Sequence, residues 1–483
     1  MASSFGGLGI GISAIAAHQR ALDVTGHNIS NVNTPGYTRQ AINNAASLSD
    51  TVGRTGSGQM MQIGTGVEVT EIKQLRDEFL DRKIKRENCE LGYWESRQTS
   101  INELETVFND NTEEGLQSVM DNFWNSWEQL SKPTGGLTAR ALVKESAMSF
   151  IETVQYMDNT LNNYKKNKDT EIRESVKRVN EIAKQIANLN MEIKKVEAYG
   201  VTANDYRDQR ESLIDELSKM AKIQVVNTNT VNIAIEGRLL VEDNKYEQIM
   251  LTPDPDMGGL VQLNWSDTKE PLQISGGSIK SLFESRDELV NGLQDKLNEF
   301  VRGVATEINA IHIQGFGIKD GVRRNFFVNE LDGSGDNISV QNIALNPDLN
   351  DFDNIAAGGS YGNAEDNTIA LQLASLRQQD AFSDNKYETD TSLRKYNFDE
   401  YYRNIISDIG NKGQEAATAA SAQQQLVEQL EYKRQSISAV SLDEEMSNLI
   451  KFEHSYNSAA RVVNAMDEML DMIINKTGLS GRS

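Results

Sequence analysis

The chain has 483 residues, too many for one hydrophobic core, so its length predicts two to four domains. A formal net charge of −23 argues against a nucleic-acid partner, because phosphate binding needs clustered Lys and Arg. No stretch approaches the roughly 18–20 continuous apolar residues of a membrane helix, which argues against a membrane partner. Cys89 is the only cysteine, so no disulfide can form within the chain.

The first thirty residues contain large apolar side chains at heptad spacing, which predict a stripe along a helix that needs a partner. Glycines crowd the beginning of this segment. Burying a large aliphatic side chain contributes roughly 1.5–3 kcal/mol, whereas fixing one residue's backbone costs about 1–2 kcal/mol. We therefore expect the segment to be disordered in the monomer and to fold on assembly. The residues of the stripe are Leu8, Ile12, Ile15, Leu22 and Ile29.

A polar segment follows and has the composition of a helix stop. Pro35 presets the first central position of a turn, and Gly36 accepts the positive φ of the second, so a type II turn is predicted from Thr34 to Tyr37. The Ser-, Gly- and Thr-rich stretch 45–66 then predicts an irregular or β connection. The residues expected to shape the turn are Asn28, Asn31, Asn33, Thr34, Pro35, Gly36 and Tyr37.

The middle of the chain alternates between two periods. Residues 73–197 are helical in period, with a break at 132–136, and a further helix is predicted at 206–221. The period then becomes two, and short runs separated by turn residues predict an antiparallel β region with strands at 223–226, 231–235, 238–241, 246–251 and 260–265. Helix returns at 278–312, a short irregular or β insertion covers 316–361, and helices resume to the end.

The C-terminal segment contains a richer apolar stripe. Ser441, followed by Glu444 three residues later, predicts a capping box just before it. This helix is expected to be partly formed alone and still adhesive. Its stripe consists of Leu449, Phe452, Tyr456, Ala459, Val463, Met466, Leu470 and Ile473.

Together these patterns predict a mainly α fold with an inserted antiparallel β domain, elongated and built from discontinuous domains. Because the strands lie between outgoing and returning helices, the two termini should meet and pair as a coiled coil. We expect an assembly domain at 1–72 and 437–483. A helical shaft is expected at 73–221, 276–315 and 362–436, and an outer β-rich domain at 222–275 and 316–361.

The sequence offers no constellation of catalytic, cofactor-binding or metal-binding residues. Its four histidines lack the spacing of a zinc site. The segment 331–336 resembles a calcium loop but lacks the alternating ligands and the terminal Glu, so a tight turn is the better interpretation. Phe123, Trp124 and Trp127 form an aromatic stripe at helical spacing, which is typical of a helix core. We predict a protein that is not an enzyme and needs no cofactor.

The terminal segments carry a family resemblance. Residues 28–37 resemble the N-terminal signature of the bacterial flagellar axial proteins of rod, hook and hook-associated type, and residues 441–450 with 455–461 resemble their C-terminal signature. The interior segments 204–218, 276–283 and 408–412 are similar to the hook-associated members. Rod and hook proteins lack the long helical shaft expected between 140 and 197.

This resemblance implies a structural subunit at the junction between the extracellular flagellar hook and filament. Implied partners are further copies of the chain in a helical ring, the hook protein, a second hook-associated junction protein and a cytoplasmic chaperone on the C-terminal helix. The family also implies type III export with the ends unfolded. Two alternatives stay open, a distal-rod or hook subunit and a secreted coiled-coil adhesin.

Overall fold

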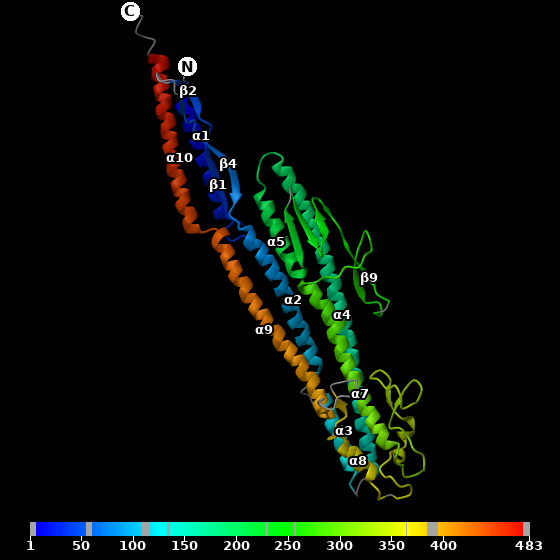
Figure 1. Ribbon diagram of the computed structural model, residues 1–483. Helices are drawn as coiled ribbons and strands as arrows, with labels where there is room; N and C mark the ends of the chain where they lie inside the picture. Colours follow the sequence, from blue (N-terminus) through cyan, green and yellow to red (C-terminus); the bar gives the residue numbers. More distant parts are fainter. Residues whose placement is uncertain are drawn as a thin grey trace, which may run out of the picture.

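The computed structural model describes residues 6–54, 60–108, 115–132, 136–227, 230–255, 257–363, 365–383 and 395–476. The protein is a long rod of helices with both termini at the same end (Figure 1). Small antiparallel sheets lie along its sides. The mainly α, elongated fold with paired terminal helices was therefore predicted correctly.

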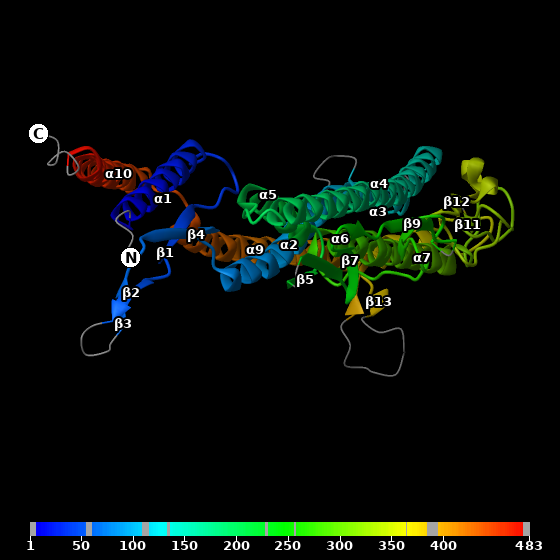
Figure 2. The same ribbon diagram turned by 90° about the horizontal axis from the view of Figure 1, so that it is seen from above.

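One end of the rod is formed by the two ends of the chain. Helix α1 (Gly6–Ser30) runs antiparallel to α10 (Leu442–Asp471), which continues into a π turn at Met472–Lys476. Strands β1 (Gln40–Ala46) and β4 (Val67–Gln74) pair beside α1, and the hairpin of β2 (Asp50–Arg54) and β3 (Met60–Ile63) projects away from it (Figure 2). We call α1, α10 and β1–β4 the terminal unit.

The shaft is built from long helices that run away from the terminal unit. Helix α2 (Glu78–Phe108) packs against the returning α9 (Phe398–Ser438), which begins with a capping box made by Asn397 and Glu400. Helix α4 (Leu137–Glu197) has 61 residues and is therefore about 90 Å long. It turns back into α5 (Asn204–Met220). The predicted break at 132–136 separates α3 from α4, although 133–135 lie outside the described residues.

The outer end of the shaft contains the larger apolar core. Helix α3 (Leu116–Leu130) packs there with the first half of α4, with α7 (Val290–His312) and with α8 (Thr368–Leu376). The aromatic stripe of α3 is fully buried in this core, which confirms its predicted packing role. The smaller elements at this end are β11 (Phe327–Asn329), β12 (Ile343–Leu345), the 3-10 turns Pro347–Asn350 and Phe352–Asn354, β13 (Phe382–Ser383) and β14 (Lys395–Tyr396).

A second core lies along the other half of α4, closer to the terminal unit. It combines α4, α5 and α6 (Gly277–Glu284) with a four-stranded sheet of order β5-β6-β7-β8 and a β9–β10 hairpin. Side chains of β6 such as Ile233 and Ile235 are completely buried in this core. The strands are β5 (Ile223–Asn227), β6 (Val231–Ile235), β7 (Arg238–Glu242), β8 (Lys245–Tyr246), β9 (Ile249–Pro253) and β10 (Val261–Trp265).

The structure corrects three details of the sequence prediction. Segments 222–275 and 316–361 do not form one β-rich domain, because Phe326, Phe327 and Ile355 pack into the outer core while the strands pack on the inner half of α4. The single strand expected at 246–251 is divided between β8 and β9. The helix expected at 278–312 is interrupted by a π turn at Ser285–Leu289. No helix in the described ranges is both long and apolar enough to cross a bilayer.

Candidate assembly interface and its joint to the shaft

The first turns of α1 contact α10 through small residues. A Cβ atom built on Gly7 would lie 2.7 Å from the Met466 side chain, and one on Gly11 would lie 2.6 Å from that of Val463. Further along α1 the same face buries Ala21. Gly11 needs a small side chain because the Val463 backbone nitrogen would lie only 3.7 Å from the added Cβ. The neighbour of Gly7, in contrast, is the flexible end of the Met466 side chain.

The large apolar residues predicted as the seam of α1 lie on the flank of this contact instead. Ile12 is 54 % exposed, and Leu8, Ile15, Leu22 and Ile29 are half-buried. Each of Leu8, Ile12, Leu22 and Ile29 lies one residue after a contact residue, so it is rotated by about 100° around the helix. The predicted register was therefore wrong by one residue, because it gave weight to large side chains and none to glycine.

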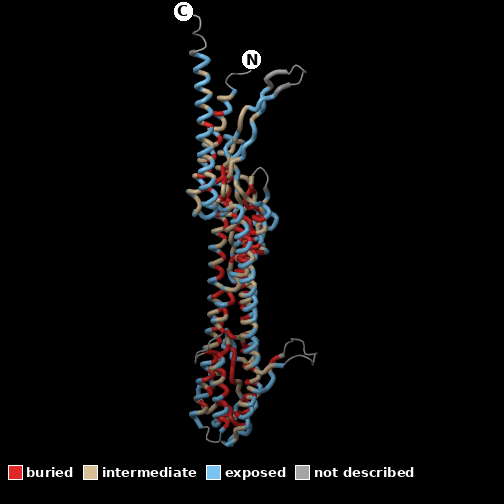
Figure 3. Tube along the Cα trace, turned by 90° about the vertical axis from the view of Figure 1, so that its left-hand side faces the viewer, coloured by how far each residue is buried: buried red, intermediate tan, exposed pale blue. Residues whose placement is uncertain are grey.

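The predicted stripe of α10 faces α1 over most of its length. Ala459 is buried, the Phe452 ring lies 6.5 Å from that of His18, and Val463 and Met466 meet the glycines of α1. Leu449, Tyr456 and Leu470 are half-buried, while Ile473 lies beyond them in the π turn and is exposed. Figure 3 shows that burial is concentrated in the shaft, whereas α10 keeps much of its surface exposed.

The turn after α1 has the predicted geometry. Gly36 has φ +77°, and the amide of Tyr37 donates to the carbonyl of Thr34 at 3.2 Å. Asn31 donates to the carbonyl of His27 at 3.0 Å, while Asn33 and Pro35 are exposed. Burial and the nearby carboxylates raise the pKa of Tyr37 well above its usual range, so its hydroxyl stays protonated.

Asn28 is the buried centre of this region. Its Nδ2 donates to the carbonyl of Gln40 at 2.9 Å and to Glu445 Oε2 at 3.1 Å. Its Oδ1 accepts from the Tyr37 hydroxyl at 2.8 Å and from the Gln40 amide at 3.0 Å. Both donor and both acceptor positions of the carboxamide are thus used, and they tie α1, the turn, β1 and α10 together.

Arg39 is the positively charged partner of the buried carboxylate of Glu445. Glu445 is only 2 % exposed, and it accepts from Arg39 Nε at 2.8 Å and Nη2 at 2.7 Å. Glu444 accepts from Arg39 Nη1 at 2.6 Å. Burial lowers the pKa of Arg39, but the two carboxylates outweigh it and raise the pKa overall. The predicted Ser441–Glu444 capping box is not formed, because Ser441 makes no side-chain cap and Glu444 turns to Arg39 instead.

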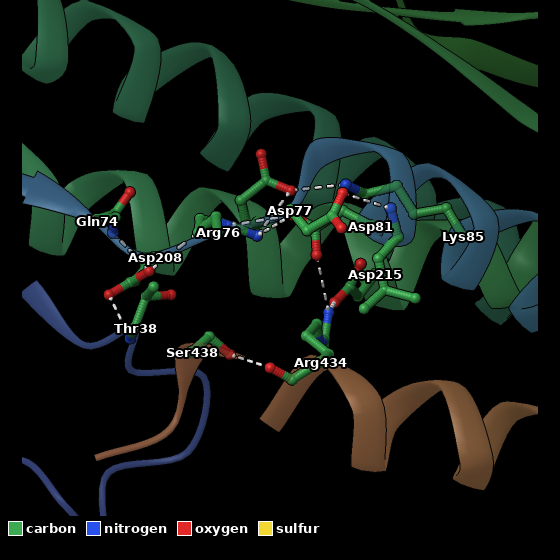
Figure 4. Close-up of polar contacts among 12 residues, drawn as sticks. Thr38, Gln74, Arg76, Asp77, Asp81, Lys85, Asp208, Asp215, Arg434 and Ser438 are labelled. Carbon is green, nitrogen blue, oxygen red and sulfur yellow. Dashed lines mark hydrogen bonds and ion pairs between the residues drawn. The ribbon is translucent and has the colours of Figure 1, made fainter. Parts of the chain in front are cut away.

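The first turns of α5 hold the terminal unit from the side of the shaft (Figure 4). Asp208 accepts from the Thr38 amide at 2.9 Å and from Gln74 Nε2 at 2.7 Å. Burial raises the pKa of Asp208 despite these hydrogen bonds. Asn204 Nδ2 donates to Gln40 Oε1 at 3.1 Å.

A network of ion pairs continues from Asp208 into the shaft. Arg76 contacts Asp81 at 3.1 Å and Glu211 at 3.5 Å, and Lys85 pairs with Glu211 at 2.7 Å (Figure 4 shows Arg76, Asp81 and Lys85). Burial raises the pKa of Glu211, but Lys85 and Arg76 outweigh it and hold the pKa below its usual value. Partly buried pairs of this kind fix geometry more reliably than they add stability.

Within the described ranges no three His, Cys, Asp or Glu residues are grouped so that they could hold a metal ion. Cys89 is buried, and burial raises the pKa of its thiol to about 11, which disfavours the reactive thiolate. The histidines lie apart, and His312 is enclosed in the outer core.

Comparisons with known proteins agree with the geometry of the termini. The chain is 32 % identical to the flagellar hook-associated protein 1 of Bacillus subtilis over 516 aligned residues, which cover all of both chains. The chain belongs to the flagellar hook-associated protein 1 family. It is also 24 % identical to the Escherichia coli member, over 96 % of this chain and 98 % of that one.

Three family models match parts of this chain, one from a hook-associated protein and two from flagellar rod proteins, and a solved structure has a similar fold. Residues 101–327 match the helical domain of the flagellar hook-associated protein FlgK. Residues 8–38 match the flagella basal body rod protein, and 433–476 match the C-terminal region of the flagellar basal body rod FlgEFG proteins. The fold is similar to that of the flagellar hook junction protein FlgK from Burkholderia pseudomallei, with TM-score 0.62 at 13 % identity over 74 % of this chain and all of that one.

The sequence did not indicate which residues join the terminal unit to the shaft. Asn28 and Tyr37 stood in the N-terminal signature, but Arg39, Asp208 and Glu445 were not singled out. One signal was available, because the family resemblance included 204–218 and 441–450, the segments that contain the two acidic residues. Neither segment is apolar or periodic, so no pattern indicated that they meet.

Proposed function

We propose that this chain is a structural subunit at the junction between flagellar hook and filament, and that copies assemble through their terminal units. The observation that carries this proposal is that the α1–α10 pair leaves Ile12 exposed and the other large apolar residues of the same row on α1 only half-buried. Its relationship to hook-associated protein 1 along the whole chain supports the place of assembly. The relatives' structural role supports a subunit without catalysis.

The uncovered apolar residues lie on both sides of the helix pair. In an antiparallel helix pair, the residues that follow each contact position by one lie on the same side of both helices. The α1 row and the exposed Met446 and Ile450 of α10 occupy such positions, so they share one side of the pair. Val462 and Met469 are exposed one residue before contact positions and lie on the opposite side. Two different apolar sides favour head-to-tail packing of copies into a ring or helix.

The terminal unit also bears on how the protein is exported and on which proteins it contacts. Its α1–α10 contact depends on small residues, so it contributes little apolar burial before neighbours arrive. We propose that the ends pass through the type III channel unfolded, and that a chaperone covers α10 in the cytoplasm. The hook protein and a second hook-associated protein would be its neighbours outside the cell. In this proposal the terminal unit forms the inner layer and the shaft lies outside it.

The test is complementation of a strain that lacks the gene. Ile12→Asn removes apolar area from the exposed row, so we expect a folded, exported subunit that leaves hooks bare of filaments and cells non-motile. Ile318→Asn is the matched control, because Ile318 is similarly exposed but lies in the outer region of the shaft. Electron microscopy counts hooks and filaments, and the culture medium is assayed for exported subunit.

Three outcomes would contradict the proposal. Normal filaments with Ile12→Asn would show that this row is not an assembly surface. If deletion of the gene removed the hook itself, the chain would be a rod or hook subunit instead. Export that persists in a strain without the flagellar export apparatus would favour the adhesin alternative.

A further inference from the structure

The terminal unit is joined to the shaft by two covalent connections that lie side by side. They are residues 75–77, between β4 and α2, and residues 439–441, between α9 and α10. Arg39 lies between them, because its amide donates to the Ser438 carbonyl at 2.8 Å and its carbonyl accepts from the Leu75 amide at 2.9 Å. Both connections are therefore held at one place, which can serve as a pivot.

Beside this pivot the terminal unit contacts α5 through polar groups. The Asp208 carboxylate accepts hydrogen bonds from the Thr38 amide in the turn and from the Gln74 side chain at the end of β4. Gln40 contacts α5 twice, since its Oε1 accepts from Asn204 and its Nε2 donates to Asp205 at 3.0 Å. In the described part of the chain, none of the three apolar clusters includes a residue of the terminal unit. Water can replace such hydrogen bonds at small net cost.

The joint also has open space beside the polar contacts. A groove of about 690 Å³ lies between the turn and helices α4 and α5, and Pro35, Gly36, Leu189 and Ser212 are among its lining residues. Close-packed interiors resist deformation, so a joint that moves needs unfilled volume next to it. The groove provides this volume on the side where Asp208 holds the turn.

We propose that this joint is a hinge held closed by a polar clasp. Arg39 marks the pivot, and Asp208 is the clasp that links the turn and β4 to α5. When the clasp opens, the terminal unit turns relative to the shaft while both parts stay folded. The inference concerns the single chain and does not depend on the proposed place of the protein in the flagellum. In an assembly, the hinge lets shafts take different angles on a common inner layer.

Distance measurements between spin labels on the full-length chain test the proposal. The labels are placed on cysteines at the exposed positions Glu453 of α10 and Lys184 of α4, in a Cys89→Ala background. Asp208→Ala opens the clasp, so the distance distribution should become at least twice as wide as in the parent. Glu192→Ala removes an acidic residue that pairs within α4, with Lys195, and should leave the width unchanged.

A second variant keeps the test decisive if Asp208→Ala does not fold. Gln74→Leu removes one of the two donors to Asp208 from a different element and should broaden the distribution to a smaller extent. Circular dichroism confirms the helix content of each variant. The proposal is overturned if every folded clasp variant has the width of the parent, or if Glu192→Ala broadens the distribution as much as they do.

Discussion

Replacing Asn28 by Ala should release the α1–α10 pair, because this buried carboxamide makes four hydrogen bonds to three other segments. A hydrogen bond of this kind contributes about 1 kcal/mol net, so the loss is about 4 kcal/mol for the set. At about 1.4 kcal/mol per factor of ten, the amides of α1 and β1 should exchange about a thousandfold faster. Native-state hydrogen exchange on the purified chain measures this directly.

The control for Asn28 stands in the same signature. Asn33 is exposed, so Asn33→Ala should leave exchange in α1 within a few-fold of the parent. Amides of the outer core should be unaffected in both variants, because none of the three segments that Asn28 contacts belongs to that core. If Asn28→Ala left the amides of α1 as protected as in the parent, or if Asn33→Ala were equally damaging, the Asn28 hydrogen bonds would not hold α1 in place.

Two further predictions concern a contact and a buried histidine. Gly11→Val should separate α1 from α10 and abolish complementation, because even an added Cβ would lie 2.6 Å from the Val463 side chain. Gly9→Ala should be tolerated, because nothing lies within 4 Å of the added carbon. Motility assays compare the two variants, and a motile Gly11→Val strain would contradict this packing. Burial lowers the pKa of His312 to about 4 from an ordinary 6.5, so the folded protein favours the neutral imidazole. The contribution of His312 to the free energy of unfolding should therefore be fully present above pH 6.5 and be lost as the pH drops towards 4. His312→Gln should flatten this part of the profile in thermal unfolding between pH 7 and 4.5, and an unchanged slope would show that His312 is not responsible.

The sequence predicted the elements of this fold better than their packing. Periodicity located the long helices and the strands of the β region, because an apolar face repeats at 3.6 or at 2 residues. It could not show that segments 222–275 and 316–361 belong to different cores. That division depends on where Phe326 and Phe327 pack, and a short aromatic run has no period to reveal it.

The candidate site shows the same division between pattern and placement. Phe452, Val463 and Met466 of the predicted α10 stripe face α1, and their large side chains made this stripe visible in the sequence. The contact face of α1 was missed because it begins with Gly7 and Gly11, which have no side chain for an apolar pattern to register. Glu444 was assigned to a helix cap on spacing alone, but Arg39 competes for it from a segment about 400 residues earlier in the chain. Contacts of this kind are set by tertiary structure.

Gold-labelled antibody on intact flagella shows where along the flagellum the protein is located. A chain that joins hook to filament should be labelled in one narrow band at the distal end of the hook, and the hooks of a deletion strain should be present, unlabelled and bare. Label spread along the hook, confined to the rod, or found on cells that lack flagella would contradict a place at the hook–filament junction.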